Sequence, residues 1–202
     1  GTVTTGVMHL AQAVFFDDDA VSGAGSAGAE AGGASDGATV VDLGEGATLS
    51  PAQLQTLALA QALELPSEHP VARAIVAGTQ LDGVQAPQIS EFTNHAGRGV
   101  SATVAHAAGQ SYAVVGKATW LSQQGVSLEQ AGAQVRALED TGATVVLVAS
   151  GPDPKSLRLR AALAVRDEPK PTTAKAISEL KAMGLRPILL TGDNERAAKF
   201  IA

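Results

Sequence analysis

The chain has 202 residues, of which 45% are hydrophobic and only 3% aromatic, and its formal net charge is −6. It has no cysteine, which excludes a disulfide framework, a zinc-thiolate site and a thiol nucleophile. No apolar run approaches the ~18 residues of a membrane-spanning helix, and the acidic balance, with no basic stripe among aromatic residues, argues against a nucleic-acid surface.

The first part of the chain predicts two strands, a loop between them and then a helix. Apolar residues predict strands at 7–16 and 39–43. The segment 17–37, rich in Asp, Gly, Ala and Ser, predicts a disordered surface loop. It has too few large apolar side chains for their burial to offset the conformational entropy lost on ordering. Ser50, Pro51 and Gln53 form a capping-box pattern that predicts a helix to about Glu64.

The segment 64–74 places a carboxylate and an imidazole at the junction of two helices. Pro66 ends the first helix, and Pro70 suits the first turn of a second. His69 therefore lies at a helix entrance, where unpaired N–H groups and the helix dipole favour an anion. Glu64 lies at a helix C-terminus, which is unfavourable for a carboxylate. The pair suits a nucleotide; the alternative is that His69 only caps and packs its helix.

Residues 89–149 predict an antiparallel meander, then a helix and a buried strand. Strands are expected at 89–93, 100–104 and 111–115, with a polar glycine loop at 94–99. Ser127 and Gln130 repeat the capping-box pattern and predict a helix to Asp140, and residues 144–149 predict a buried strand.

Two glycine motifs in this region are ambiguous by themselves. Gly97-Arg98-Gly99 lies between strands and favours a turn over a phosphate cradle. Gly116-Lys117 either brings an ammonium group to a phosphate or closes a hairpin. The histidines at 9, 95 and 106 lack partners at ligand spacing, so we expect them to be structural or exposed.

The end of the chain predicts a parallel arrangement. A strand at 157–165, a helix at 173–183, a buried strand at 187–190, a tight turn and a last helix form a βαβ pattern. Ligands of such sheets bind at the carboxyl ends of strands, where Thr191, Gly192 and Asp193 follow. Asp193 suits magnesium or phosphoryl chemistry, or it caps the last helix. We expect an α/β fold with a mostly antiparallel sheet flanked by helices and a truncated parallel piece.

The chain contains, in this order, the motifs Ser67-Glu68-His69-Pro70, Gly97-x-Gly99, Gly116 before a Trp-Leu pair, and Thr191-Gly192-Asp193-Asn194. In their set and order these motifs resemble those of heavy-metal-transporting P-type ATPases. The opening Gly1-Thr2-Val3-Thr4 resembles the end of that family's Asp-Lys-Thr-Gly-Thr phosphorylation motif, and residues 167–171 resemble the segment that re-enters the phosphorylation domain. The chain is similar to this family outside 17–37, and both of its ends look cut.

The resemblance implies three regions. Residues 1–16 would be the end of the phosphorylation motif and a link, and 17–150 the nucleotide-binding domain. Residues 151–202 would be part of a phosphorylation domain of haloacid-dehalogenase-like, parallel α/β fold.

The resemblance also implies an ATP site. Glu64 would hydrogen-bond the adenine amino group and His69 would orient the nucleotide. Gly97 and Gly99 would let the phosphates approach the backbone, and Gly116 would border the pocket. Lys117 stands where the family usually has Asn, which would alter the ATP contacts.

A second set of residues would serve phosphoryl transfer. Thr191, Gly192 and Asp193 would support the transferred phosphoryl group and its magnesium ion in the full-length parent. We expect no metal-ligand set in this chain. The phosphorylated aspartate is missing from it, so we expect no turnover by the chain alone.

The expected function is the ATP-binding cytoplasmic part of a membrane pump, most similar to the monovalent copper or silver branch. ATP or ADP and the membrane domain of the same parent chain would be its partners, and the piece is expected to be monomeric. The alternatives are a zinc or cadmium pump and a stand-alone adenine-nucleotide-binding regulatory module. A haloacid-dehalogenase-like phosphatase would need a nucleophilic aspartate near the start, and the aspartates at 17–19 are too loop-like for that role.

Overall fold

The computed structural model describes residues 4–16, 38–43, 47–80, 85–107, 109–170 and 172–188. Within this part of the chain, seven strands form one sheet in the order β2-β1-β7-β6-β5-β4-β3. The strands are β1 (Thr4–Phe16), β2 (Ala38–Asp42), β3 (Ile89–His95), β4 (Gly99–His106), β5 (Gly109–Gly116), β6 (Thr144–Gly151) and β7 (Arg158–Pro169). The helices are α1 (Pro51–Glu64), α2 (Pro70–Gly78), α3 (Ala118–Gln123), α4 (Gly132–Asp140) and α5 (Thr173–Ala182).

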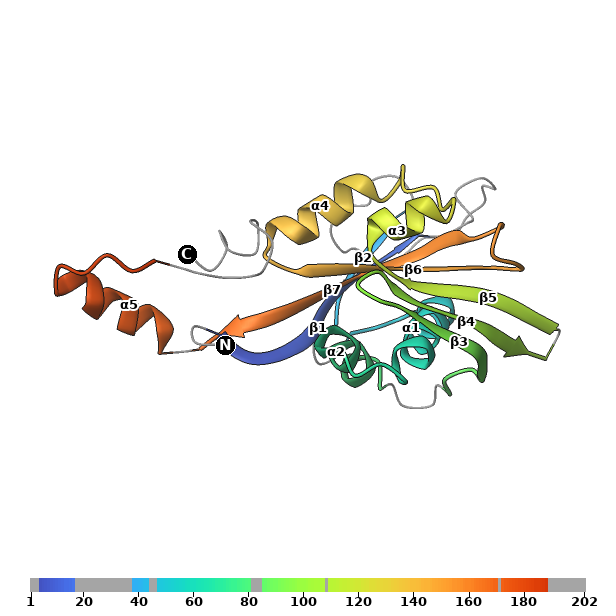
Figure 1. The fold of residues 1–202 in the computed structure, drawn as a ribbon, viewed down its shortest axis with the longest axis horizontal. Coiled ribbons are helices and arrows are strands. Elements are labelled where there is room, and N and C mark those ends of the chain that lie inside the picture. Colours follow the sequence, from blue (N-terminus) through green and yellow to red (C-terminus); the bar gives the residue numbers. More distant parts are fainter. Residues whose placement is uncertain are drawn as a thin grey trace.

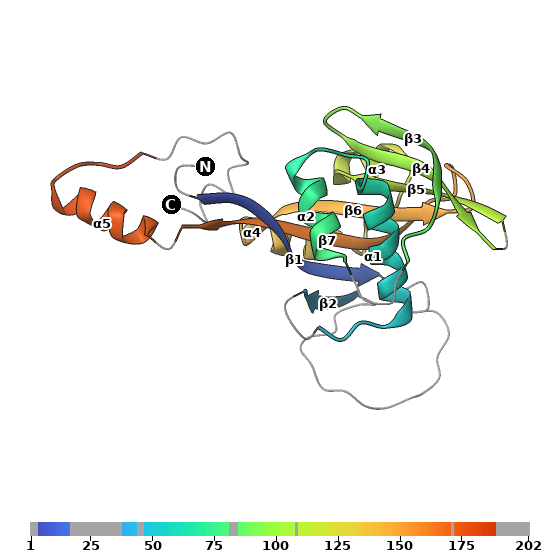
Figure 2. The ribbon, with the colours of Figure 1, turned by 90° about the horizontal axis from the view of Figure 1, so that it is seen from below.

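The helices cover both faces of the sheet. Helices α1 and α2 lie on one face, and α3 and α4 lie on the other (Figure 1). Figure 2 shows the strand order, with β2 at one edge and β3 at the other. All neighbouring strands pair antiparallel, so the predicted α/β class with an antiparallel sheet flanked by helices is confirmed.

Strand alternation divides the core into two apolar layers. Along β6, Val146 and Val148 join the cluster under α1 and α2, whereas Leu147 and Ala149 join the cluster under α3 and α4. Successive side chains of a strand point to opposite faces, which explains why these buried strands read as continuous apolar runs.

The junction of α1 and α2 forms as the sequence predicts. The Ser50 hydroxyl accepts a hydrogen bond from the N–H of Gln53, and the Gln53 side chain accepts one from the N–H of Ser50. This reciprocal capping box fixes the start of α1. The helix ends at Glu64, and Pro70 opens α2.

The helix expected from the pattern Ser127 to Gln130 begins later than predicted. Helix α4 begins at Gly132, and its N-cap residue, Ala131, makes no side-chain capping bond. The N–H groups of Ala131 and Gly132 donate to the carbonyl of Leu128, and this turn buries Ala131 completely. Tertiary burial therefore overrides the local capping pattern, and the capping-box prediction here was wrong. Helix α3 was not predicted; it buries Trp120 and Leu121.

Near the end of the described chain, one predicted element is present and one is not. Helix α5 is followed by Gly184 at a φ of +77°, as expected. Pro187 and Ile188 belong to no strand, and Ile188 is 84% exposed, so the buried strand predicted there is wrong for these residues. No strand of the described chain pairs with them, and an unpaired strand is not stable. The predictions for 1–3, 17–37 and 189–202 lie outside the described residues.

Strand β7, which we expected to open the partial phosphorylation domain, lies between β1 and β6 in the same sheet. Its end pairs with the start of β1, as far as Thr4 opposite Pro169. The two strands run together beyond the other strands, and α5 lies past their end (Figure 1). Among the described residues, no helix is both long and apolar enough to cross a membrane.

Candidate functional site

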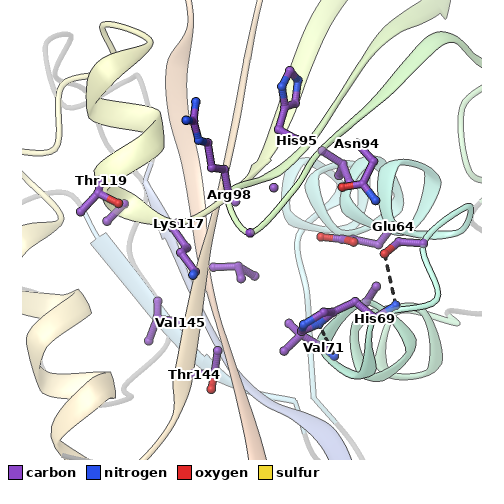
Figure 3. Close-up of a pocket in the computed structure, with 18 of the residues that line it drawn as sticks. Glu64, His69, Val71, Asn94, His95, Arg98, Lys117, Thr119, Thr144 and Val145 are labelled. Atoms are coloured by element: carbon purple, nitrogen blue, oxygen red, sulfur yellow. Dashed lines mark hydrogen bonds between the residues drawn. The ribbon is translucent and has the colours of Figure 1, made fainter. Parts of the chain in front are cut away.

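A pocket of about 480 Å³ opens where β4 and β5 meet, between the two helical layers (Figure 3). The structure brings all six residues predicted to bind nucleotide to its lining: Glu64, His69, Gly97, Gly99, Gly116 and Lys117. The predicted phosphoryl-site residues Thr191, Gly192 and Asp193 lie outside the described residues. The chemical roles of both sets stay predictions.

The pocket exists because β5 is shorter than β6 at this end of the sheet. Strand β5 ends at Gly116, opposite Leu147. Strand β6 begins three residues earlier, at Thr144, where it pairs only with β7. The edge of β6 from Thr144 to Val146 therefore lines the cavity instead of pairing with β5. Strand edges present backbone donors and acceptors.

Glu64 is the last residue of α1 and is only 7% exposed. Burial raises the pKa of this carboxyl from its ordinary value of 4.5 to about 7, because removal from water disfavours the charged form. Near neutral pH the group is therefore partly protonated. It can then both accept and donate hydrogen bonds at the wall of the pocket.

His69 is the N-cap of α2. Its ring Nδ1 accepts a hydrogen bond from the backbone N–H of Val71 at 3.3 Å. The backbone N–H of His69 donates to Ser67 Oγ at 3.4 Å. The prediction that His69 caps the helix is confirmed. Capping uses Nδ1, so a neutral ring carries its proton on Nε2. That leaves one donor for a ligand, and the predicted nucleotide role is compatible with the cap.

Two of the predicted glycines are required by the packing of the protein itself. A Cβ on Gly99 would lie 2.2 Å from the Val115 carbonyl oxygen and 2.8 Å from the Trp120 ring. A Cβ on Gly116 would lie 2.6 Å from the Arg98 carbonyl oxygen and 2.7 Å from the same ring. Gly97, at a φ of +70°, has nothing within 4 Å of its Cβ position. Of these three glycines, only Gly97 has open space for the close approach of a phosphate chain.

Lys117 precedes α3 and makes no side-chain capping bond. Its N–H donates to the carbonyl of Arg98 at 2.9 Å. Both side chains are exposed and both residues line the pocket. In Figure 3, Lys117 lies across the cavity from Glu64 and His69, beside Thr144 and Val145.

Sequence reasoning missed several lining residues, among them Asn94, Arg98, Thr119, Glu139 and Thr144. Asn94 and Arg98 flank the predicted glycine loop, so their position beside it was a usable signal. Thr119, Glu139 and Thr144 had no local signal, because their place in the lining depends on the tertiary fold; Thr144, for example, reaches the cavity because β5 ends at Gly116.

His95, expected to be structural or exposed, also lines the pocket but is held by the protein. Its Nε2 and Ser101 Oγ form a hydrogen bond of 2.9 Å. Its ring lies 4.7 Å from that of Trp120. These contacts agree with the structural role predicted for this histidine, whereas its place in the pocket lining was not predicted.

Comparison with known proteins decides the family. The family model of the haloacid dehalogenase-like hydrolases matches residues 1–202. The chain belongs to this family. It is 35% identical over 148 residues to a copper-exporting P-type ATPase of Vibrio cholerae, and 37% identical over 146 residues to one of Bacillus subtilis. These matches cover 73% and 72% of this chain but only 15% and 17% of those relatives.

A solved structure agrees with these relatives. The fold is similar to a crystal structure of a zinc-transporting PIB-type ATPase in the E2.Pi state, with a TM-score of 0.56 and 31% sequence identity. The similarity covers 81% of this chain and 24% of that one. The resemblance to heavy-metal-transporting P-type ATPases, inferred from the motifs, is confirmed.

Proposed function

We propose that this chain is the ATP-binding part of an ATP-driven heavy-metal pump. One observation carries the proposal. Six residues between positions 64 and 117, all of which the motif resemblance predicts to bind nucleotide, line one cavity of about 480 Å³. That volume lies in the range of small-molecule sites.

The walls of the cavity suit the parts of an adenine nucleotide. The Glu64 carboxyl accepts a hydrogen bond from the adenine amino group, in either protonation state. Nε2 of His69 donates a hydrogen bond that orients the nucleotide. Gly97 gives the phosphate chain access to the backbone, because no atom lies within 4 Å of its Cβ position. Gly99 and Gly116 keep the turn and the strand end close enough to form the wall.

In the parent protein the bound ATP would phosphorylate an aspartate outside this chain, supported by Thr191, Gly192 and Asp193. Magnesium would neutralise the developing charge on the transferred group. Among the described residues no group of three or more His, Cys, Asp or Glu side chains could hold a metal ion. We therefore assign magnesium no step in the described pocket.

We propose monovalent copper as the cargo, because the two relatives reported above are named copper-exporting. The membrane domain of the same parent would be the partner, and this region would face the cytoplasm. Zinc or cadmium is the alternative, since the similar solved structure is that of a zinc transporter. The residues encoded just before Gly1 would distinguish a pump from a stand-alone regulatory module. Asp-Lys-Thr after apolar helices would support the pump.

The sheet also suggests where the two domains divide. Because β7 lies between β1 and β6, we propose that the nucleotide-binding domain extends to about Pro169 instead of ending at 150. Paired β1 and β7 would then be the two strands that join it to the phosphorylation domain.

The test is an ATP titration of the chain without magnesium, followed by amide NMR. We expect shift changes to cluster at Glu64, His69, Gly97 and Lys117, with micromolar to millimolar affinity. The absence of binding, or shift changes confined to residues 191–194, would overturn the proposal.

A further inference from the structure

The two sides of the pocket differ in charge. Glu64 and His69 lie on the side of α1 and α2, while Lys117 and Arg98 lie away from them, toward α3 and β6 (Figure 3). Arg98 and Lys117 are the only Lys or Arg side chains among the described lining residues. The chain as a whole carries a net charge of −6. A polyanion bound here would therefore depend on local cations, not on the overall field.

The register of the sheet holds the backbones of Arg98 and Lys117 together, and their side chains leave this point in different directions (Figure 3). Gly99 pairs directly with Gly116 across β4 and β5. Arg98 precedes the first of these glycines and Lys117 follows the second. The hydrogen bond from the Lys117 N–H to the Arg98 carbonyl, 2.9 Å long, locks the two backbones. Two long side chains thus start from adjoining points at the rim of one cavity.

We propose that Arg98 and Lys117 form a phosphate clamp, which makes the site select nucleotides by the number of their phosphates. This inference rests on the proposed ATP-binding function, which already places the base at Glu64, and adds the two cations as contacts of the phosphates. The nearly neutral base lies toward Glu64 and the triphosphate toward Arg98 and Lys117. The guanidinium group can bind two phosphate oxygens at once, and the ammonium group acts as a point charge.

Other groups on the side of Arg98 and Lys117 would bind phosphate less strongly than these two cations. Thr119 and Thr144 line the cavity near Lys117 and bring hydroxyl groups. Glu139 of α4 also lines the cavity, away from Glu64, and it already interacts with another group of the protein. The two cations therefore outnumber the one acid at this end of the pocket. They provide its attraction for phosphate.

The single tryptophan of the chain provides a fluorescence signal with which nucleotide binding can be measured. Trp120 is its one tryptophan, and its buried ring packs against Gly99 and Gly116, which line the pocket. Its fluorescence can follow titrations with ATP, ADP, AMP and adenosine in EDTA. The variant is the double substitution Arg98→Gln and Lys117→Gln. Both residues are exposed, so the fold should be kept, and a thermal melt checks this.

A matched control removes the same charge elsewhere. Lys155 and Lys175 are exposed and do not line the pocket. The double substitution Lys155→Gln and Lys175→Gln therefore changes the net charge by the same amount.

We expect the wild type to bind ATP more tightly than ADP, and ADP more tightly than AMP. The pocket variant should lose about tenfold in ATP affinity or more, with adenosine affinity unchanged within twofold. The control should keep the wild-type values.

The possible results separate this inference from the proposed function. Wild-type protein that binds adenosine and ATP equally would overturn the clamp and leave the adenine site standing. A pocket variant that keeps the wild-type ratio of ATP to AMP affinity would also overturn it. If no adenine compound binds the wild type, the proposed function fails together with the clamp.

Discussion

Gly99 and Gly116 face each other across β4 and β5, and the ring of Trp120 occupies the space where either would carry a side chain. An alanine at either position must displace backbone atoms that lie within 3 Å of its Cβ. We expect Gly99→Ala and Gly116→Ala to lower the free energy of unfolding by about 1–3 kcal/mol each, as overpacking does. Denaturant titration measures this.

The control for these variants is Gly132→Ala. Gly132 lies in the first turn of α4, and the nearest atom to its Cβ position is a flexible arginine nitrogen 3.5 Å away. Alanine there should leave stability unchanged or raise it, by up to about 1 kcal/mol. Equal stability of the Gly99 variant and the wild type would contradict the packing role.

Gly97→Ala tests a different role, because its Cβ would meet no protein atom. Its positive φ of +70° costs an alanine about 1 kcal/mol. Gly125, at +85° and equally open, has the same kind of backbone cost outside the pocket lining. We expect Gly97→Ala to weaken ATP binding about fivefold or more and Gly125→Ala to leave it unchanged, measured by the same titration. Similar ATP affinities for the two variants would argue against close approach of phosphate to this turn.

The parts of the fold that the sequence predicts well are those with short-range signals. Ser50 and Gln53 cap α1 through atoms three residues apart, and Pro70 opens α2 by its own ring geometry. Glu64 and His69 could be proposed as a pair because they flank this junction. The start of α4 could not be predicted, because the burial of Ala131 depends on distant residues.

The pocket shows the same division between local and tertiary information. Gly97 carries a local signal, a glycine in a polar turn. The need for glycine at 99 and 116 depends on a strand register and on Trp120, neither of which is visible in the spacing. Thr144 lines the cavity because β5 stops at Gly116. That strand end is set by the whole sheet.

His69 is both a helix cap and a proposed nucleotide contact, and two substitutions separate the roles. His69→Asn keeps a side-chain acceptor at the N-cap, whereas His69→Ala removes it. We expect the alanine variant to lose about 1 kcal/mol of stability and the asparagine variant to lose little. Both should weaken ATP binding, because Nε2 is gone in each. Thermal melts and ATP titrations measure the two effects. Full ATP affinity in a stable His69→Asn variant would restrict His69 to its capping role.

Glu64 should make the stability of the chain depend on pH in a direction unusual for a carboxylate. Its pKa is about 7 in the folded chain against an ordinary 4.5, so the folded state binds more protons between these values. The free energy of unfolding should therefore fall as pH rises from about 4.5 to 7 and stay lower above 7. The difference corresponds to about 3 kcal/mol at most.

Glu64→Gln keeps the shape of the side chain and removes the titration. We expect the free energy of unfolding of the Glu64→Gln variant, relative to that of the wild type, to increase by about 1–3 kcal/mol between pH 5 and pH 8. Urea unfolding at several pH values measures this. Glu68→Gln, at an exposed position between α1 and α2, controls for the loss of one charge and should show no such growth. A difference that is constant with pH would mean that the Glu64 carboxyl stays ionised in the folded chain. Water or a hydrogen-bond donor would then have to reach it in the pocket.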